Sequence, residues 1–178
     1  MKTLLIAGLL AAGGIATAPT AMAHAGHNHG TPSANAHSGH MIVQAAKAKA
    51  STTLTVSGCW IRSLPAPAPS AGYFVVKNAD SQVRTLKSAS SAVYGMVMLH
   101  QTTHKDGMSR MSETHDIAIP AGAELEFKPG GYHAMLEMPV STPEIGSKVA
   151  MDFMFDNDEK ATAQCDVREA KAMAPMSH

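Results

Sequence analysis

Short runs of hydrophobic and β-branched residues, separated by turn residues, dominate the chain from Thr53 onward. Such runs predict β-strands, in which successive side chains point to opposite faces of a sheet. Three of them lie in the first half, at residues 53–56, 59–62 and 72–77. The loop 64–70 holds three prolines, which cannot lie within a central strand. The pattern therefore predicts strands that alternate with tight or stiff connections.

Six further strands are predicted in the second half, at residues 83–92, 94–100, 124–127, 133–138, 149–155 and 161–167. No long helical periodicity interrupts them. Many short strands at close spacing indicate an all-β fold, an antiparallel sandwich or barrel. We expect this domain to occupy residues 51–168.

Residues 1–23 resemble a secretory signal peptide. Lys2 supplies the positive start, residues 4–15 form an apolar run, and Ala21-Met-Ala23 fits the small-x-small cleavage rule. The run is too short and too rich in glycine to span a membrane well, and no cysteine follows it. We therefore expect export to the periplasm, not a lipoprotein, with cleavage after Ala23 or, as a competing site, after Ala25. The mature form then has no membrane span.

Two arms flank the predicted domain. We expect residues 24–50 to form a flexible arm. It carries five histidines: His24, His27, His29, His37 and His40. They favour capture of a divalent metal such as Cu(II), the alternative being a tail that only increases solubility. Residues 169–178 form a tail with Met173, Met176 and His178. We expect the tail to bind Cu(II) as well, the alternative being a disordered end without a ligand.

The composition limits the classes of function that the chain can have. The formal net charge is zero, which argues against a nucleic-acid binder, and aromatic residues make up only 4%. Methionine and histidine are abundant instead, with 13 and 10 residues. Both bind copper, and the mixture of soft thioethers with imidazoles favours Cu(I) over zinc, calcium or magnesium.

The candidate ligands for a Cu(I) site are His100, Met111, His133 and Met135. The last two are separated by one residue, so a strand presents both on one face. Met96, Met98 and His100 share a face for the same reason. We expect Met96, Met151 and Met154 to fill the core and His104 and His115 to lie on the surface. For Met98 and Met108, packing and ligation stay open.

Two cysteines, Cys59 and Cys165, lie near the two ends of the predicted domain. In an exported protein they can form one disulfide, and the alternative is two free thiols. Sequence alone does not decide between them.

The spacing of the four candidates is similar to the H-x10-M-x21-H-x-M signature of the PCu(A)C family of periplasmic copper chaperones. The resemblance covers nearly all of residues 53–167 and includes shorter matches: Trp60-Ile-Arg62, Gly72-Tyr73, Asp106-Gly107, Ile119-Pro-Ala-Gly122 and Lys128-Pro-Gly-Gly-Tyr-His133. It implies a cupredoxin-like, Greek-key β-barrel with Cu(I) on the four matched residues. It also implies delivery of copper to a respiratory oxidase, at its copper A centre.

The partner implied is an oxidase subunit or another chaperone of the Sco type, and we expect a monomer that is not an enzyme. A periplasmic copper-storage or resistance buffer is the alternative. Blue-copper electron transfer requires a cysteine grouped with histidine and methionine, which the chain lacks. A zinc hydrolase lacks its paired histidines and general base, and a thiol reductase lacks C-x-x-C spacing.

Overall fold

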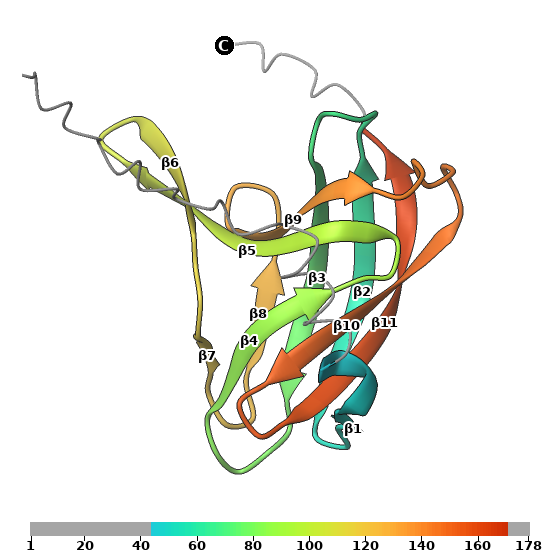
Figure 1. The fold of residues 1–178 in the computed structure, drawn as a ribbon. Coiled ribbons are helices and arrows are strands. Elements are labelled where there is room, and N and C mark those ends of the chain that lie inside the picture. The colour runs from blue at the N-terminus through green and yellow to red at the C-terminus, as the bar shows by residue number, and fades with distance from the viewer. Residues whose placement is uncertain (1–43, 171–178) are drawn as a thin grey trace, which may run out of the picture. The chain divides into compact units, whose positions relative to one another are not determined.

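The computed structural model describes residues 44–170, and strands account for most of them (Figure 1). A single helical turn at residues 44–47 precedes the first strand. The strands are β1 (Lys49–Ala50), β2 (Leu54–Ser63), β3 (Ser70–Asn78), β4 (Arg84–Ser90), β5 (Tyr94–Lys105), β6 (Met108–Glu113), β7 (Ile117–Ile119), β8 (Glu124–Phe127), β9 (Tyr132–Pro139), β10 (Lys148–Phe155) and β11 (Glu159–Glu169). The predicted all-β class is confirmed. No helix in the described range is long and apolar enough to cross a membrane.

The strands form one sheet in the order β6-β5-β9-β8-β3-β2-β11-β10-β4-β7, with β1 paired to β11. Most neighbours are antiparallel, as predicted. β2 and β11 are parallel neighbours instead, so the two ends of the domain lie side by side. Parallel neighbours need a long connection between them, and here most of the domain forms that connection.

Alternation along the strands builds one core that the sheet wraps around. In β10 the buried positions are Val149, Met151, Phe153 and Phe155, every second residue. At the centre, the ring of Phe74 stacks on Phe127 at 4.2 Å and meets Phe153 at 4.5 Å. Each such buried aromatic side chain contributes about 1.5–3 kcal/mol relative to an exposed one. Hydrophobic burial therefore holds the sheet in its curved form.

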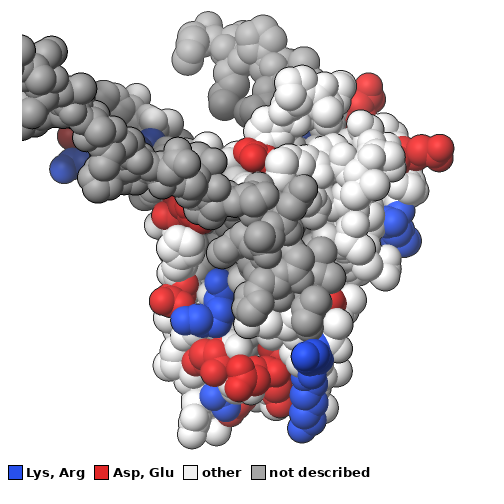
Figure 2. Space-filling view, in the orientation of Figure 1, with Lys and Arg blue, Asp and Glu red and all other residues white. Residues whose placement is uncertain are grey.

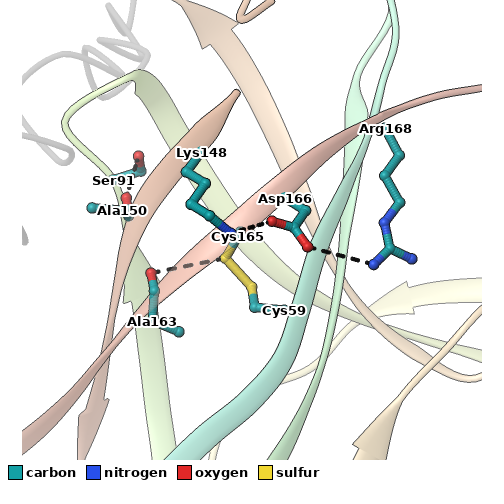
Figure 3. The surroundings of a disulfide bond; sticks show 8 residues. All are labelled: Cys59, Ser91, Lys148, Ala150, Ala163, Cys165, Asp166 and Arg168. Atoms are coloured by element: carbon teal, nitrogen blue, oxygen red, sulfur yellow. Dashed lines mark hydrogen bonds and ion pairs between the residues drawn. A yellow bond between two sulfur atoms is a disulfide. The ribbon is translucent and has the colours of Figure 1, made fainter. Parts of the chain in front are cut away.

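Cys59 on β2 and Cys165 on β11 form a disulfide (Figure 3). Both residues are buried, and they are 106 positions apart in the sequence. Of the two alternatives left open by the sequence, the structure therefore has the disulfide. Closing a loop of this length lowers the entropy of the unfolded chain and contributes about 4–5 kcal/mol in the chain-entropy model.

The structure departs from the predicted strands in three ways, the first of which is that β6 and β7 were not predicted. Residues 53–56 and 59–62 belong to one strand, β2, because Gly58 (φ +60°) forms a bulge instead of a turn. Residues 44–50, expected within the flexible arm, form the helical turn and β1, with Ala45 buried. The ordered fold therefore begins before residue 51.

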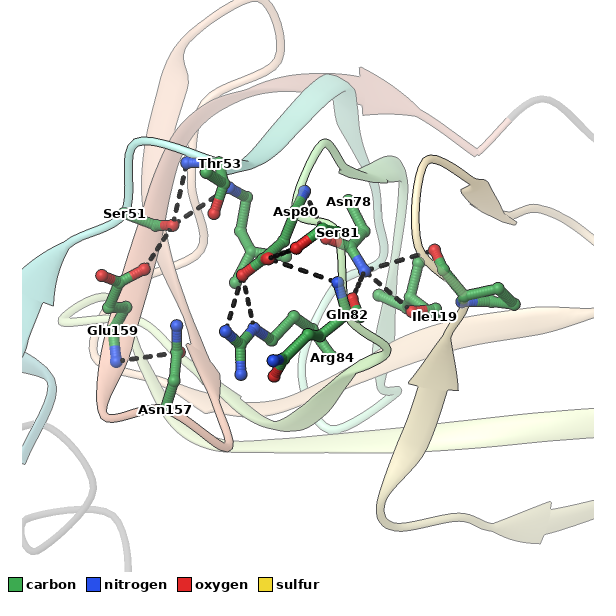
Figure 4. A network of polar contacts seen from close by, with 12 residues as sticks. Ser51, Thr53, Asn78, Asp80, Ser81, Gln82, Arg84, Ile119, Asn157 and Glu159 are labelled. Atoms are coloured by element: carbon green, nitrogen blue, oxygen red, sulfur yellow. Dashed lines mark hydrogen bonds and ion pairs between the residues drawn. The ribbon is translucent and has the colours of Figure 1, made fainter.

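A polar network around Asn78 joins three elements at the lower end of the barrel (Figure 4). The Asn78 side chain is fully buried, and its Nδ2 donates to the carbonyl oxygens of Gln82, Ile119 and Pro120. Its Oδ1 accepts from the backbone N–H of Asp80, at 2.9 Å. The side chain thus ties the end of β3 to β7 and to the turn before β4.

Charged side chains of both signs lie intermixed at the lower end of the barrel, and the few in the upper right of this view stand at its edge (Figure 2). Among them are the pairs Arg84–Asp80, at 2.6 Å, and Lys160–Asp152, at 3.2 Å. Charges of opposite sign compensate locally, in agreement with the zero net charge of the chain.

Candidate metal centre

The predicted ligands lie on β5, β6 and β9, at one end of the strand order. Leu99, Ala134 and Leu136 point into the core. Side chains alternate along a strand, so the residues between them face outward. In the antiparallel ladder of β5 and β9, His100 lies opposite His133 and Met98 lies opposite Met135. The core pattern therefore fixes these two pairs on one outer face.

Met111 reaches this face from the β5–β6 hairpin. Asp106 (φ +52°) and Gly107 (φ +74°) form its two-residue turn, which suits the twist of paired strands. Met111 lies opposite Thr102, one step along the same face from His100.

The site brings the imidazoles and the Met111 thioether together. The rings of His100 and His133 have centroids 5.8 Å apart and planes inclined by 21°. The Met111 Sδ lies 3.2 Å from the His133 Nε2. Met135 is placed beside them by its register with Met98. All four residues singled out by the sequence thus lie on one face.

The hydrogen bonds of His133 define which ring nitrogen carries the proton. Its Nδ1 lies 3.1 Å from the Gly131 carbonyl oxygen, which can only accept, so Nδ1 is the donor. In the neutral ring, Nε2 then presents a lone pair. The Met111 sulfur is also an acceptor, so no proton joins the two atoms. Two lone pairs that converge in this way suit a metal ion.

His100 has an equally unsatisfied nitrogen. The residue is 7% exposed, and its buried Nδ1 has no hydrogen-bond partner in the part of the chain that the structure describes. Burial, and then the neighbouring His133, lowers the pKa of His100. The ring is therefore neutral at neutral pH, as a metal ligand must be. A buried nitrogen without a partner is costly, and a metal ion would satisfy it.

The Pro129-Gly-Gly turn before β9 positions His133. Gly130 has φ +78°, a conformation that favours glycine, and the Gly131 N–H donates to the Lys128 carbonyl at 3.0 Å. The Gly131 carbonyl accepts from the Thr102 N–H, also at 3.0 Å. The same carbonyl accepts from the His133 ring. One carbonyl therefore joins the turn, β5 and the imidazole.

His104 supports this turn from the hairpin. It is exposed, as predicted, but its Nε2 donates to the Gly130 carbonyl at 3.1 Å. Its Nδ1 then accepts from the Ser109 hydroxyl at 2.8 Å. The sequence predicted a surface histidine and missed this contact, because the Gly130 partner comes from a turn 26 residues away.

Of the remaining assignments made from the sequence, some are confirmed and others are wrong. Met151 lies fully in the core and His115 on the surface, as predicted. Met96 and Met154 are only half-buried and lie outside the core cluster, so that part of the prediction is wrong. Met108 is 72% exposed at the hairpin. The proposed arm ligands lie outside the described residues: His24, His27, His29, His37, His40, Met173, Met176 and His178.

Comparison with known protein families gives a match over residues 54–167 to the family described as "Putative lipoprotein LpqE-like". A relative from Leifsonia xyli subsp. xyli, named "Putative lipoprotein Lxx21020", is 29% identical over 123 residues, 68% of this chain and 73% of the relative. An uncharacterized protein of Rickettsia prowazekii is 30% identical over 90 residues, 50% of each chain.

Solved structures of PCuAC domains are similar in fold. The apo PmoF2 PCuAC domain aligns with a TM-score of 0.57 at 20% identity, over 71% of this chain and 98% of the domain. The copper-bound PCuAC domain from PmoF2 gives 0.55 at 19%, over 68% and 97%. The CuI-DR1885 structure from Deinococcus radiodurans gives 0.53 at 23%, over 72% and 87%. These likenesses confirm the cupredoxin-like fold expected from the sequence.

Proposed function

This chain belongs to the LpqE-like family, and from that premise we propose that it is a copper chaperone that binds one Cu(I) through His100, Met111, His133 and Met135. The contact between the His133 Nε2 and the Met111 Sδ, 3.2 Å apart, is the observation that supports this most, because the neutral ring and the thioether both offer a lone pair to a metal ion there. Two solved domains of the same fold are described as copper-bound, which agrees with the proposal.

The donor set selects the oxidation state. Two neutral imidazoles and two thioethers are soft or borderline ligands without charge, and such ligands favour Cu(I). Hard cations such as calcium and magnesium prefer oxygen ligands. Within residues 44–170, no three histidine, cysteine, aspartate or glutamate side chains gather as a metal site. The candidate centre therefore depends on its methionine sulfurs.

Exposure of one ligand favours transfer over permanent storage. Met111 is 52% exposed and lies on β6, the last strand at its end of the sheet. A partner protein can replace this thioether with a ligand of its own while the two histidines still hold the ion. Neutral thioethers also release Cu(I) more readily than thiolates would.

For the recipient, we propose a respiratory oxidase subunit with a copper A centre, with a Sco-type chaperone as another partner. The chain would act in the periplasm as a monomer, after removal of a signal peptide near Ala23. The histidines of residues 24–50, together with Met173, Met176 and His178 of the tail, would bind Cu(II) outside the barrel. In this proposal the barrel itself handles only Cu(I).

The rival electron-transfer function is disfavoured by the cysteines. A blue-copper site uses a cysteine thiolate, and both cysteines of this chain are joined in the disulfide. A periplasmic copper buffer stays the second candidate, because the arms carry many ligands of their own.

An experiment with truncated chains separates the chaperone from the buffer. Residues 24–43 and 171–178 are deleted, which leaves the described fold intact, and the protein is loaded with one Cu(I). Transfer to a purified soluble copper A domain is then followed by the absorption of the recipient. A chaperone transfers its copper at an unchanged yield, whereas a buffer loses most of its copper capacity and delivers little.

A further inference from the structure

β5 and β9 arrange four side chains as the corners of a square on the outer face of the barrel. Met98 and His100 are two residues apart on β5, and His133 and Met135 are two residues apart on β9. His100 lies opposite His133, and Met98 lies opposite Met135. Three corners are proposed copper ligands. The fourth corner, Met98, is also a methionine.

Ladder geometry places Met98 beside two of the proposed ligands. Opposite residues have Cβ atoms about 4.5–5.5 Å apart, whereas diagonal neighbours are about 7–8 Å apart. His100 and Met135 are diagonal to each other, and Met98 is adjacent to both. An ion that binds these two residues therefore lies within reach of the Met98 thioether. Met96, one step further along β5, faces Glu137 instead.

Met98 and Met111 approach the centre from different surroundings. Met111 belongs to the terminal strand β6 and is 52% exposed, whereas Met98 is half-buried on β5, between β6 and β9. A partner protein that approaches from solvent meets Met111 first. Met98 remains behind with the histidines and Met135.

Met98 also has room to move. Its side chain borders a cavity of about 300 Å³ between β4 and β5, together with Met96, Glu113 and His115. Methionine has three rotatable side-chain bonds and adapts to irregular space. The Met98 side chain can therefore turn from the cavity toward the centre without displacing the core.

From this arrangement we propose that Met98 is a third thioether ligand of the Cu(I) site, which binds the ion together with Met135 when Met111 is displaced. The proposal rests on the proposed function. It involves ligand exchange only: the Met111–copper bond breaks, a Met98–copper bond forms, and copper stays Cu(I). The centre thus keeps four ligands, two of them sulfurs, after its exposed ligand is displaced.

A double-mutant cycle tests the proposal through Cu(I) affinity, measured by competition with a chromophoric chelator. The variants are Met98→Leu, Met111→Leu and the double variant, with Met154→Leu as a control for a half-buried methionine on β10. Leucine is close to methionine in volume, so folding should be preserved. We expect the fold-loss of Cu(I) affinity in the double variant to exceed the product of the two single-variant losses by about 10-fold. The reason is that Met98 compensates for Met111 in the Met111→Leu variant.

X-ray absorption of the Cu(I)-loaded Met111→Leu variant gives a second test that leaves Met98 intact. Two sulfur ligands are expected, from Met98 and Met135, and a single sulfur would overturn the proposal. An unchanged affinity of Met98→Leu in both backgrounds would also overturn it and make Met98 a packing residue. Failure of the unmodified protein to bind Cu(I) would contradict the proposed function itself, so the two failures are distinguishable.

Discussion

The His133 Nε2 lies 3.2 Å from the Met111 Sδ, and the other ring nitrogen of His133 faces the Gly131 carbonyl oxygen, so the neutral ring directs its Nε2 lone pair toward the sulfur. These residues come from strands that are not neighbours in the sheet, with β5 between them. The Met111 side chain therefore extends across β5 to reach the ring.

Gly130→Ala should destabilise the turn before β9. Gly130 has φ +78°, where a side chain costs about 1–2 kcal/mol, although nothing lies closer to the added Cβ than the His104 Nε2 at 3.7 Å. Urea unfolding should show a loss of that size, together with weaker Cu(I) binding. Gly131→Ala is the matched control: its φ is not positive, and an added Cβ meets only ordinary contacts at 3.6 Å. Equal losses for the two variants would contradict this account of the turn.

His104→Ala should weaken Cu(I) binding although His104 is not a proposed ligand. The variant removes the hydrogen bond to the Gly130 carbonyl and releases the hairpin that carries Met111. Because His104 contacts the turn and not a ligand, the loss should stay below the roughly 10–100-fold that removing a ligand's own hydrogen-bond partner costs. Chelator competition measures the effect. His115→Ala, which removes an exposed histidine beside Glu113, should leave the affinity unchanged.

Removal of the disulfide should lower stability without removing the metal site. The Cys59→Ala/Cys165→Ala variant should lose about 4–5 kcal/mol in its free energy of unfolding, because the unfolded chain regains a long loop. The disulfide joins β2 and β11, away from β5, β6 and β9. Cu(I) affinity of the folded variant should therefore match that of the unmodified protein, and a large loss would link the disulfide to the site.

The Asp80–Arg84 pair should make stability depend on acid pH. The hydrogen bond from Arg84 holds the pKa of Asp80 below its ordinary value of 3.8. A depressed folded-state pKa gives a stabilisation that is present above pH 3.8 and lost as the pH falls through the lower folded value. Asp80→Asn should reduce the loss of folding stability between about pH 5 and about pH 2, the range in which carboxylates become protonated. The midpoint of urea unfolding, measured across this pH range, checks the prediction, and equal profiles for Asp80→Asn and the unmodified protein would contradict it.

Local patterns predicted much of the fold and of the site. The alternation of hydrophobic and polar residues predicted most strands. The spacing of four candidate ligands selected residues that do share one face: His100, Met111, His133 and Met135. Gly58 was read as a turn because a glycine looks the same in a turn and in a bulge. The buried Asn78 contacts depend on the position of distant β7 beside the end of β3, which no short stretch encodes.

The role of Met98 could not be predicted from the sequence. Its position two residues before His100 indicated a shared face, but packing and ligation could not be separated. The register that sets Met98 opposite Met135 is a property of two strands far apart in the chain. Met96, on the same face, shows that such a position need not lead into the core.

Cu(I) titration of the unmodified protein and of His133→Ala, against a chromophoric chelator, tests the central claim most directly. The unmodified protein should bind one Cu(I) in the barrel, and His133→Ala should lose more than about 100-fold in affinity, beyond the usual cost of losing an outer partner. Circular dichroism of the metal-free variant checks that it is folded. A folded His133→Ala variant that binds Cu(I) as tightly as the unmodified protein would contradict the claim.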